Sequence, residues 1–287
     1  MQIIRVKTPR GLELKGAMWG DNSMDSVVIM MSGIMSNVFQ NDLLTATGDL
    51  LEREGIAYIV GHAMDAFSCI GYSDFSTGKQ VYTGVVFDDF SLSYEDVASY
   101  VRYAKSLGFK KIILAGHSLG SNRIIHYLGT NKENLVDNFI VSAPIDLEHW
   151  IKVMPNVEDA INLAKNLMSN GKGEEILPFL FGGFSPMSAN AVLSFINADN
   201  LKNCPVISGK GELESLAHIA IQGSFIIGEK DSLTDNDPKG FMDRINAHTK
   251  SKDSNTILVI PEASHIFYNK HKEYAEAVLE CVRRFGA

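Results

Sequence analysis

A serine stands between two glycines in the run Gly116-His117-Ser118-Leu119-Gly120. Residues 111–115, mostly apolar, predict a buried strand before the run, and residues 119–128 predict a helix after it. A serine on such a sharp turn adopts a strained backbone, and flanking glycines remove Cβ atoms that would collide with the strand and helix. The helix would direct its N-terminal amides at the serine oxygen. The pattern predicts that Ser118 is a nucleophile, and the alternative is an ordinary glycine-rich turn.

A serine hydroxyl needs a base that takes its proton, and the base needs a third group that fixes its tautomer. Two later apolar segments, residues 224–227 and Thr256–Ile260, predict strands with suitable groups after their carboxyl ends. Asp231 follows the first strand and His265 follows the second. A single loop histidine indicates little, but the chain order serine, acid, histidine is the one that accompanies this kind of turn. We therefore expect Asp231 to orient His265, and His265 to act as the base.

The assignment of the acid has alternatives, because other carboxylates lie close to Asp231 in the sequence. Glu229, Asp235 and Asp237 are within six residues of it. Asp237 precedes Pro238 at an expected helix start, where its ordinary role is to cap the helix. Asp235 therefore remains the main alternative to Asp231.

Acyl transfer also needs two N–H donors for the oxyanion that forms in the transition state. One donor is expected to be the amide of Leu119, directly after the nucleophile. The other is expected in Ser32-Gly33-Ile34-Met35-Ser36, which follows the apolar segment Ser26–Met31. Gly33 allows the backbone to turn beside the substrate, so the amide of Ile34 is the predicted second donor.

The rest of the chain alternates between apolar strands and amphipathic helices, which predicts an α/β fold with a mostly parallel sheet covered on both faces. The carboxyl ends of parallel strands meet at one edge, so the residues named above should converge there. The expected strands span residues 2–7, 13–19, 26–31, 56–60, 111–115, 139–142, 224–227 and 256–260, and the expected helices span residues 41–54, 93–107, 119–128, 157–168, 239–248 and 268–285.

The alternation stops between residues 146 and 216, which predicts a mainly helical cap inserted into a core of residues 1–145 and 217–287. Trp150, Phe179 and Phe181 of this cap are candidate substrate contacts, although they would serve equally to pack the cap on the core.

Two other features near the expected strand ends bear on the substrate. His62 stands at a strand end and is either a further substrate contact or an ordinary loop histidine. Residues 63–90 are long for a loop and rich in aromatic residues, and they form a second candidate wall of the pocket. We expect His117 to pack in the core, pointing away from the serine.

The composition of the 287 residues excludes several classes of protein. The formal net charge is −8 and no basic stretch offsets it, which argues against a nucleic-acid partner. Cys69, Cys204 and Cys281 are too widely spaced for a metal site or a disulfide framework, which favours a reducing, cytoplasmic setting. The N-terminal residues do not match a signal peptide, and no apolar run is long enough to span a membrane. We expect no metal, no cofactor and no stable membrane association.

Residues 116–120, 32–34, 228–231 and 264–265 together resemble the α/β-hydrolase superfamily, over nearly the whole chain. This resemblance implies the α/β-hydrolase fold with an inserted cap. It departs from the family pattern at Ser32-Gly33, where His-Gly is usual; the backbone role survives this change. The chain is also similar to an uncharacterised hydrolase group that includes fungal siderophore esterases, which implies activity on a bulky hydroxamate-type ester. The residues that carry this second similarity are 114–118, 126–128, 142–146 and 186–189.

The expected activity is hydrolysis of a small-molecule carboxylic ester through an acyl-enzyme on Ser118. The same groups would serve a thioesterase, a lactonase or an acyl transferase, because only the pocket distinguishes these substrates. An alternative of another class is a ligand-binding receptor on a hydrolase fold, and the complete set of Ser118, Asp231 and His265 argues against it. The sequence indicates nothing about the oligomeric state.

Overall fold

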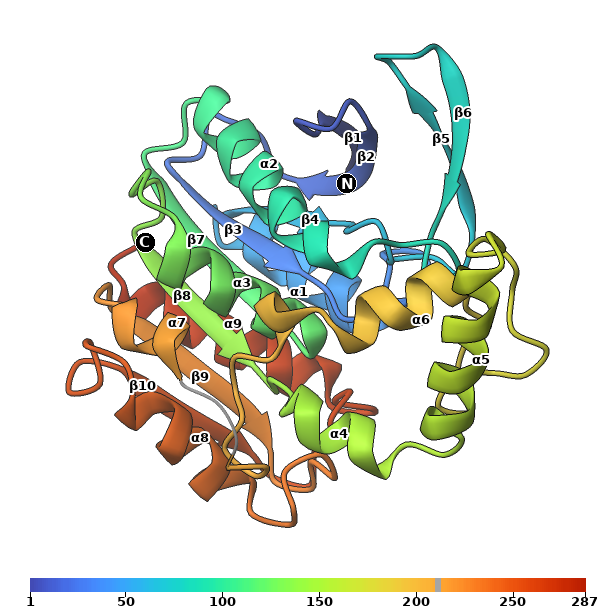
Figure 1. Cartoon of the computed structure of the whole chain (residues 1–287). Helices are drawn as coiled ribbons and strands as arrows, with labels where there is room; N and C mark the ends of the chain where they lie inside the picture. The colour runs from blue at the N-terminus through green and yellow to red at the C-terminus, as the bar shows by residue number, and fades with distance from the viewer. Residues whose placement is uncertain (210–212) are drawn as a thin grey trace.

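A computed structural model of the chain describes residues 1–209 and 213–287 and contains a central sheet of eight strands (Figure 1). Their order is β1-β2-β4-β3-β7-β8-β9-β10; β1 and β2 are antiparallel to their neighbours and the other strands run parallel. The mostly parallel sheet predicted from the sequence is confirmed. The strands are β1 (Gln2–Lys7), β2 (Glu13–Trp19), β3 (Ser26–Met31), β4 (Ala57–Gly61), β7 (Lys111–His117), β8 (Asn138–Ser142), β9 (Gly223–Gly228) and β10 (Thr256–Ile260).

Helices cover both faces of this sheet (Figure 1). α1 (Asp42–Arg53) and α9 (His271–Arg284) pack together on one face, and α2 (Ser93–Ser106), α3 (Leu119–Thr130) and α8 (Pro238–Ala247) cover the other. No helix in the described ranges is long and apolar enough to cross a membrane.

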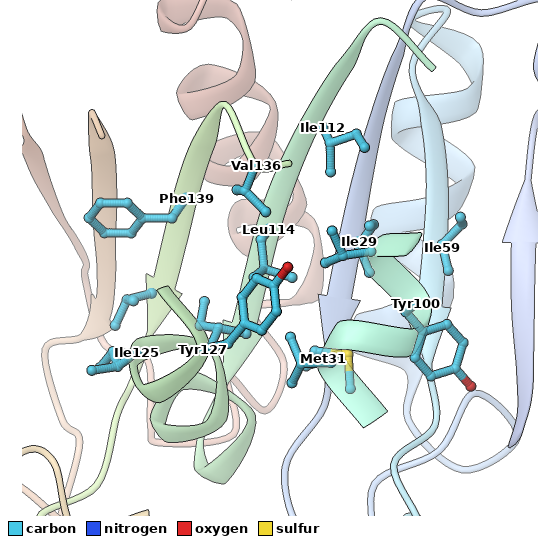
Figure 2. Packing of buried hydrophobic residues seen from close by; sticks show 14 of the residues in the cluster. Ile29, Met31, Ile59, Tyr100, Ile112, Leu114, Ile125, Tyr127, Val136 and Phe139 are labelled. Atoms are coloured by element: carbon cyan, nitrogen blue, oxygen red, sulfur yellow. The ribbon is translucent and has the colours of Figure 1, made fainter. Parts of the chain in front are cut away.

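Both faces of the central strands are buried, which explains their continuous apolar sequences. In β3, Ile29 and Met31 join the cluster beneath α2 and α3, whereas Val28 and Met30 join the cluster beneath α1 and α9. Figure 2 shows the first of these clusters, with Tyr100 of α2 among its labelled residues. The alternation of side chains along each strand thus divides the core into two halves.

The segment 63–90 differs from the long loop expected from its sequence. It contains a hairpin of two antiparallel strands, β5 (Ile70–Asp74) and β6 (Lys79–Thr83), which stands away from the central sheet (Figure 1). Tyr72 is buried in the core and Ile70 packs against the same cluster, while Tyr82 is exposed. With so few apolar residues on one face, the hairpin gave only a weak strand signal.

Between β8 and β9, the described residues contain helices and isolated bridges but no strand of the sheet. We call residues 146–216 the cap segment; its residues 210–212 lie outside the described residues. The helices are α4 (Leu147–Val153), α5 (Val157–Ser169), α6 (Ala189–Ile196), a 3-10 turn η2 (Asp199–Leu201) and α7 (Glu214–His218). α4, α5 and α6 lie beyond the arrowheads of β3, β7 and β8 (Figure 1). The boundary predicted at residue 216 falls inside α7, and this helix packs against α3.

Two buried polar residues hold the ends of the cap segment: Asp146 joins the two ends to each other, and Asn122 joins them to the core. Asp146 accepts hydrogen bonds from the amide of His149 at the start of α4, and from the amides of Ile207 and Ser208 near the other end of the segment. Asn122 of α3 donates to the carbonyl oxygens of residues 145 and 201. The two ends of the cap segment are therefore held side by side against α3.

The Asp146 contacts predict a large loss of stability on substitution. Asp146→Ala should lower the free energy of unfolding by about 2–4 kcal/mol, because three partly buried amides lose their acceptor. Asp237→Ala is the matched control: Asp237 also caps a helix, but it is exposed and accepts from one amide, that of Gly240, and from the exposed side chain of Arg244. Urea unfolding of both variants tests this expectation, and an equal loss in the two would contradict it.

Candidate active site

Ser118 connects β7 to α3 in a backbone conformation that is rare for any residue with a side chain. Its φ is 55° and its ψ is −130°, and its amide donates a hydrogen bond to the carbonyl oxygen of Ser142. A Cβ atom at Gly120 would lie 2.0 Å from the carbonyl oxygen of Met31, and one at Gly116 would lie 2.7 Å from the backbone of Gly120. Both glycines are therefore required for α3 to start this close to β3.

Three side chains form a continuous hydrogen-bonded array at this turn. His265 Nε2 lies 2.9 Å from Ser118 Oγ, and His265 Nδ1 lies 2.9 Å from Asp231 Oδ2. The Asp231 side chain has no exposed surface, and its other oxygen accepts from the amide of Leu233. A carboxylate in this position fixes the ring orientation and tautomer of the histidine, which leaves Nε2 free to accept a proton from the serine.

The other carboxylates near Asp231 have different partners. Asp237 caps α8, and Glu229 accepts a hydrogen bond from the amide of Glu262. Asp235 lies in a left-handed backbone conformation. Of the four carboxylates considered from the sequence, Asp231 alone contacts His265 in the part of the chain that the structure describes.

The loop after β3 lies directly against the serine. A Cβ atom at Gly33 would lie 2.9 Å from Ser118 Cβ and 3.2 Å from Ser118 Oγ, so only glycine allows this approach. Within the described ranges, the amides of Ile34 and Leu119 have no hydrogen-bond acceptor. Two backbone donors beside one hydroxyl are the arrangement that stabilises an oxyanion.

Two buried histidines support the backbone around this array. His117 Nε2 lies 2.9 Å from the carbonyl oxygen of His265, and His62 Nε2 accepts a hydrogen bond from the amide of Val38. Burial lowers the pKa of each, with the neighbouring His265 contributing at His117, and both pKa values are about 4, so both rings are neutral at pH 7. His62 was a candidate substrate contact; its buried ring holds the backbone after the Gly33 loop instead.

The aromatic residues of the cap segment differ in exposure. Phe181 has no exposed surface and packs edge to face against Phe195, with ring centroids 5.8 Å apart. Trp150 stacks on Phe184 at 5.6 Å, and both Trp150 and Phe179 are only half-buried. All of them belong to an apolar cluster that includes Leu119 and packs against Ile34. Trp150 and Phe179 thus remain able to contact a substrate, whereas the Phe181 side chain is packed within the cap segment.

The sequence analysis assigned no role to Arg123 or Asp65. The two side chains form a buried ion pair beneath the loop after β3. The available signal was a lone charge in the otherwise uncharged helix at residues 119–130. The described ranges contain no group of three or more side chains arranged to hold a metal ion.

The profile of a family described as "Protein of unknown function (DUF1749)" matches residues 48–285. The chain belongs to this family. The matched range includes Ser118, Asp231 and His265 but not the Gly33 loop of this DUF1749 protein. The comparison with curated proteins gives no match.

Solved structures share the fold of this DUF1749 protein over almost its whole length. The structure of DcsB in complex with its substrate analogue has a TM-score of 0.70 and 15% identity, with 98% of each chain covered. A thermophilic esterase from Thermogutta terrifontis has a TM-score of 0.62 and 16% identity, with both chains fully covered. Est1E from Butyrivibrio proteoclasticus has a TM-score of 0.59 and 13% identity, with 99% of this chain and 100% of its own covered. The predicted α/β-hydrolase fold is confirmed.

The two buried histidines predict a loss of stability in acid. Their pKa of about 4 lies below the ordinary value of 6.5, so the unfolded chain takes up protons first as the pH falls. The free energy of unfolding should therefore fall by about 2 kcal/mol for each histidine between pH 7 and pH 5. Urea unfolding at the two pH values measures this difference.

The double variant His62→Gln/His117→Gln should lose most of this pH dependence, because neither site can take up a proton. His248→Gln serves as the control, since His248 is exposed at the end of α8. An unchanged pH dependence in the double variant would show that other groups cause it.

Proposed function

We propose that this protein is a serine hydrolase that cleaves a small-molecule carboxylic ester. The observation that carries the proposal is the unbroken array from Asp231 through His265 to Ser118, at a strained turn beside two free backbone N–H groups. A merely structural serine would need neither the strain nor the two donors.

The geometry suggests the following mechanism. Ser118 Oγ attacks the ester carbonyl carbon while His265 Nε2 takes the serine proton and Asp231 stabilises the charged ring. The amides of Ile34 and Leu119 hold the oxyanion. The tetrahedral intermediate then collapses, the C–O bond to the alcohol breaks, and His265 returns the proton to the departing oxygen. Water activated by His265 hydrolyses the acyl-enzyme in the same two steps and regenerates Ser118.

The proposal of an ester as the substrate rests on the structural neighbours and on the residues around Ser118, not on the array itself. Several structural neighbours are described as esterases, including those from Thermogutta terrifontis and Exiguobacterium antarcticum. Thioesters, lactones and acyl acceptors other than water would use the same groups, so a substrate panel should include them. The half-buried rings of Trp150 and Phe179 favour an apolar group on the substrate.

The proposed roles predict a graded loss of activity. Ser118→Ala and His265→Ala should lower kcat by ~10⁴-fold or more on an activated ester such as a p-nitrophenyl ester, and Asp231→Asn should cost somewhat less. Asp235→Asn is the control and should change kcat by less than about twofold, because a surplus carboxylate has no part in a triad.

A fluorophosphonate should form one adduct, on Ser118, and none in Ser118→Ala, as mass spectrometry of the intact protein would show. Labelling of the alanine variant at another serine would refute the assignment of the nucleophile. A large effect of Asp235→Asn with a mild effect of Asp231→Asn would refute the assignment of the acid.

The cap segment predicts a separable effect on substrate choice. Trp150→Ala and Phe179→Ala should change the ratio of kcat/KM between short and bulky esters, because each ring keeps accessible surface. Phe181→Ala is the matched control: it should lower the free energy of unfolding by about 3–5 kcal/mol while leaving that ratio unchanged, because its ring is fully buried. An unchanged ratio in Trp150→Ala and Phe179→Ala would assign the pocket wall to residues 63–90.

A further inference from the structure

A buried ion pair lies beneath the loop that carries the predicted oxyanion donor. Arg123 stands on α3, five residues after Ser118, and its Nη2 donates to Asp65 Oδ2. Neither side chain has any exposed surface. Asp65 lies in the segment after β4, and Arg123 lies in the helix after β7. Because β4 and β7 are the two neighbours of β3, the pair connects the segments on either side of the loop after β3.

Both members of the pair also bind the backbone of the loop after β3. Arg123 Nη1 donates to the carbonyl oxygen of Ser32 at 3.1 Å, and the carbonyl oxygen of Asp65 accepts from the amide of Met35 at 2.9 Å. These two contacts fall on either side of Gly33 and Ile34. The loop is therefore held at Ser32, directly before the Gly33 that approaches Ser118, and at Met35, directly after Ile34.

Stability alone does not account for this pair. Asp65 Oδ1 and Arg123 Nε are buried and, among residues 1–209 and 213–287, have no hydrogen-bond partner. Burial raises the pKa of the Asp65 carboxyl, and the charge of Arg123 only opposes this effect. A buried pair that is incompletely hydrogen-bonded is often no better for stability than two apolar side chains of similar volume. The feature that apolar side chains would not reproduce is the hydrogen bond from Arg123 to the Ser32 carbonyl.

We propose that Arg123 and Asp65 are positioning residues that set the Ile34 amide relative to Ser118. The inference rests on the proposed function, since it assigns a purpose to the oxyanion donor. Oxyanion stabilisation depends on a donor held about 3 Å from the developing charge, and a displacement of about 1 Å can lower the rate by as much as ~100-fold. Neither residue touches the substrate, and both act through the loop backbone.

The test replaces both charges at once, so that no buried charge is left unpaired. The double variant Arg123→Met/Asp65→Leu should keep a melting temperature close to that of the wild type, because the site stays filled with apolar atoms. Its kcat should fall by about 10- to 100-fold with little change in KM, because the lost interaction acts on the transition state. Its rate of labelling by a fluorophosphonate should fall in the same proportion.

A second ion pair provides the matched control. Arg10 Nη2 donates to Asp96 Oδ1, and Asp96 Oδ2 accepts from the amide of Met64. Neither side chain forms a hydrogen bond with residues 32–36. Arg10→Met/Asp96→Leu should therefore keep kcat and the labelling rate within about twofold of the wild type. If the Arg123 double variant is too unstable to purify, Arg123→Lys tests the same point, because lysine keeps the charge but cannot bind both acceptors in the same geometry.

The outcomes separate this inference from the proposed function. If the wild type fails to label at Ser118 and hydrolyses no ester or thioester, the proposed function is wrong and the inference falls with it. If the wild type labels and the folded Arg123 variants label and turn over at the wild-type rate, the inference alone is wrong. Equal losses in both double variants would also refute it, because they would indicate a general effect on the core.

Discussion

The close approach of α3 to the end of β3 is the constraint on which the rest of the site depends. Gly120 has no room for a side chain, so the first turn of α3 starts against the backbone of Met31 and Ser32. Three consecutive side chains of α3 then donate hydrogen bonds to backbone carbonyl oxygens of other segments. Ser121 donates to the carbonyl oxygens of Gly116 and Ser142, Asn122 to those of Ile145 and Leu201, and Arg123 to that of Ser32. One helix turn therefore sets the strained serine, the cap segment and the Gly33 loop relative to one another.

Much of this arrangement could be predicted from the sequence because it follows from local patterns. Short apolar or alternating segments predicted the eight strands of the sheet, and the glycines around Ser118 predicted the strained turn. The position of His265 after the last strand predicted that it would lie near Ser118, because parallel strands end at the same edge. Each of these inferences needs only a few neighbouring residues and one general rule of chain geometry.

Other features could not be predicted because they depend on contacts between distant segments. Asp231 was the expected partner of His265, but Asp235 remained an alternative, because both are close to the end of β9 and only the path of the loop decides which one meets the histidine. The partial exposure of Phe179 and the full burial of Phe181 depend on how an irregular stretch of the cap segment folds. Arg123 and Asp65 carry no motif, because they pair with each other and with backbone atoms of the loop after β3, all far apart in the sequence.

Because His265 follows β10, the array of Ser118, His265 and Asp231 can form only late in protein synthesis. Ser118 and His265 are 147 residues apart, and the histidine follows β10, the outermost strand, which pairs with β9 alone. A ribosome that has made the Gly33 loop, the strained turn and the whole cap segment has still not made the histidine. The growing chain therefore carries a serine without its partner until the last strand has joined the edge of the sheet.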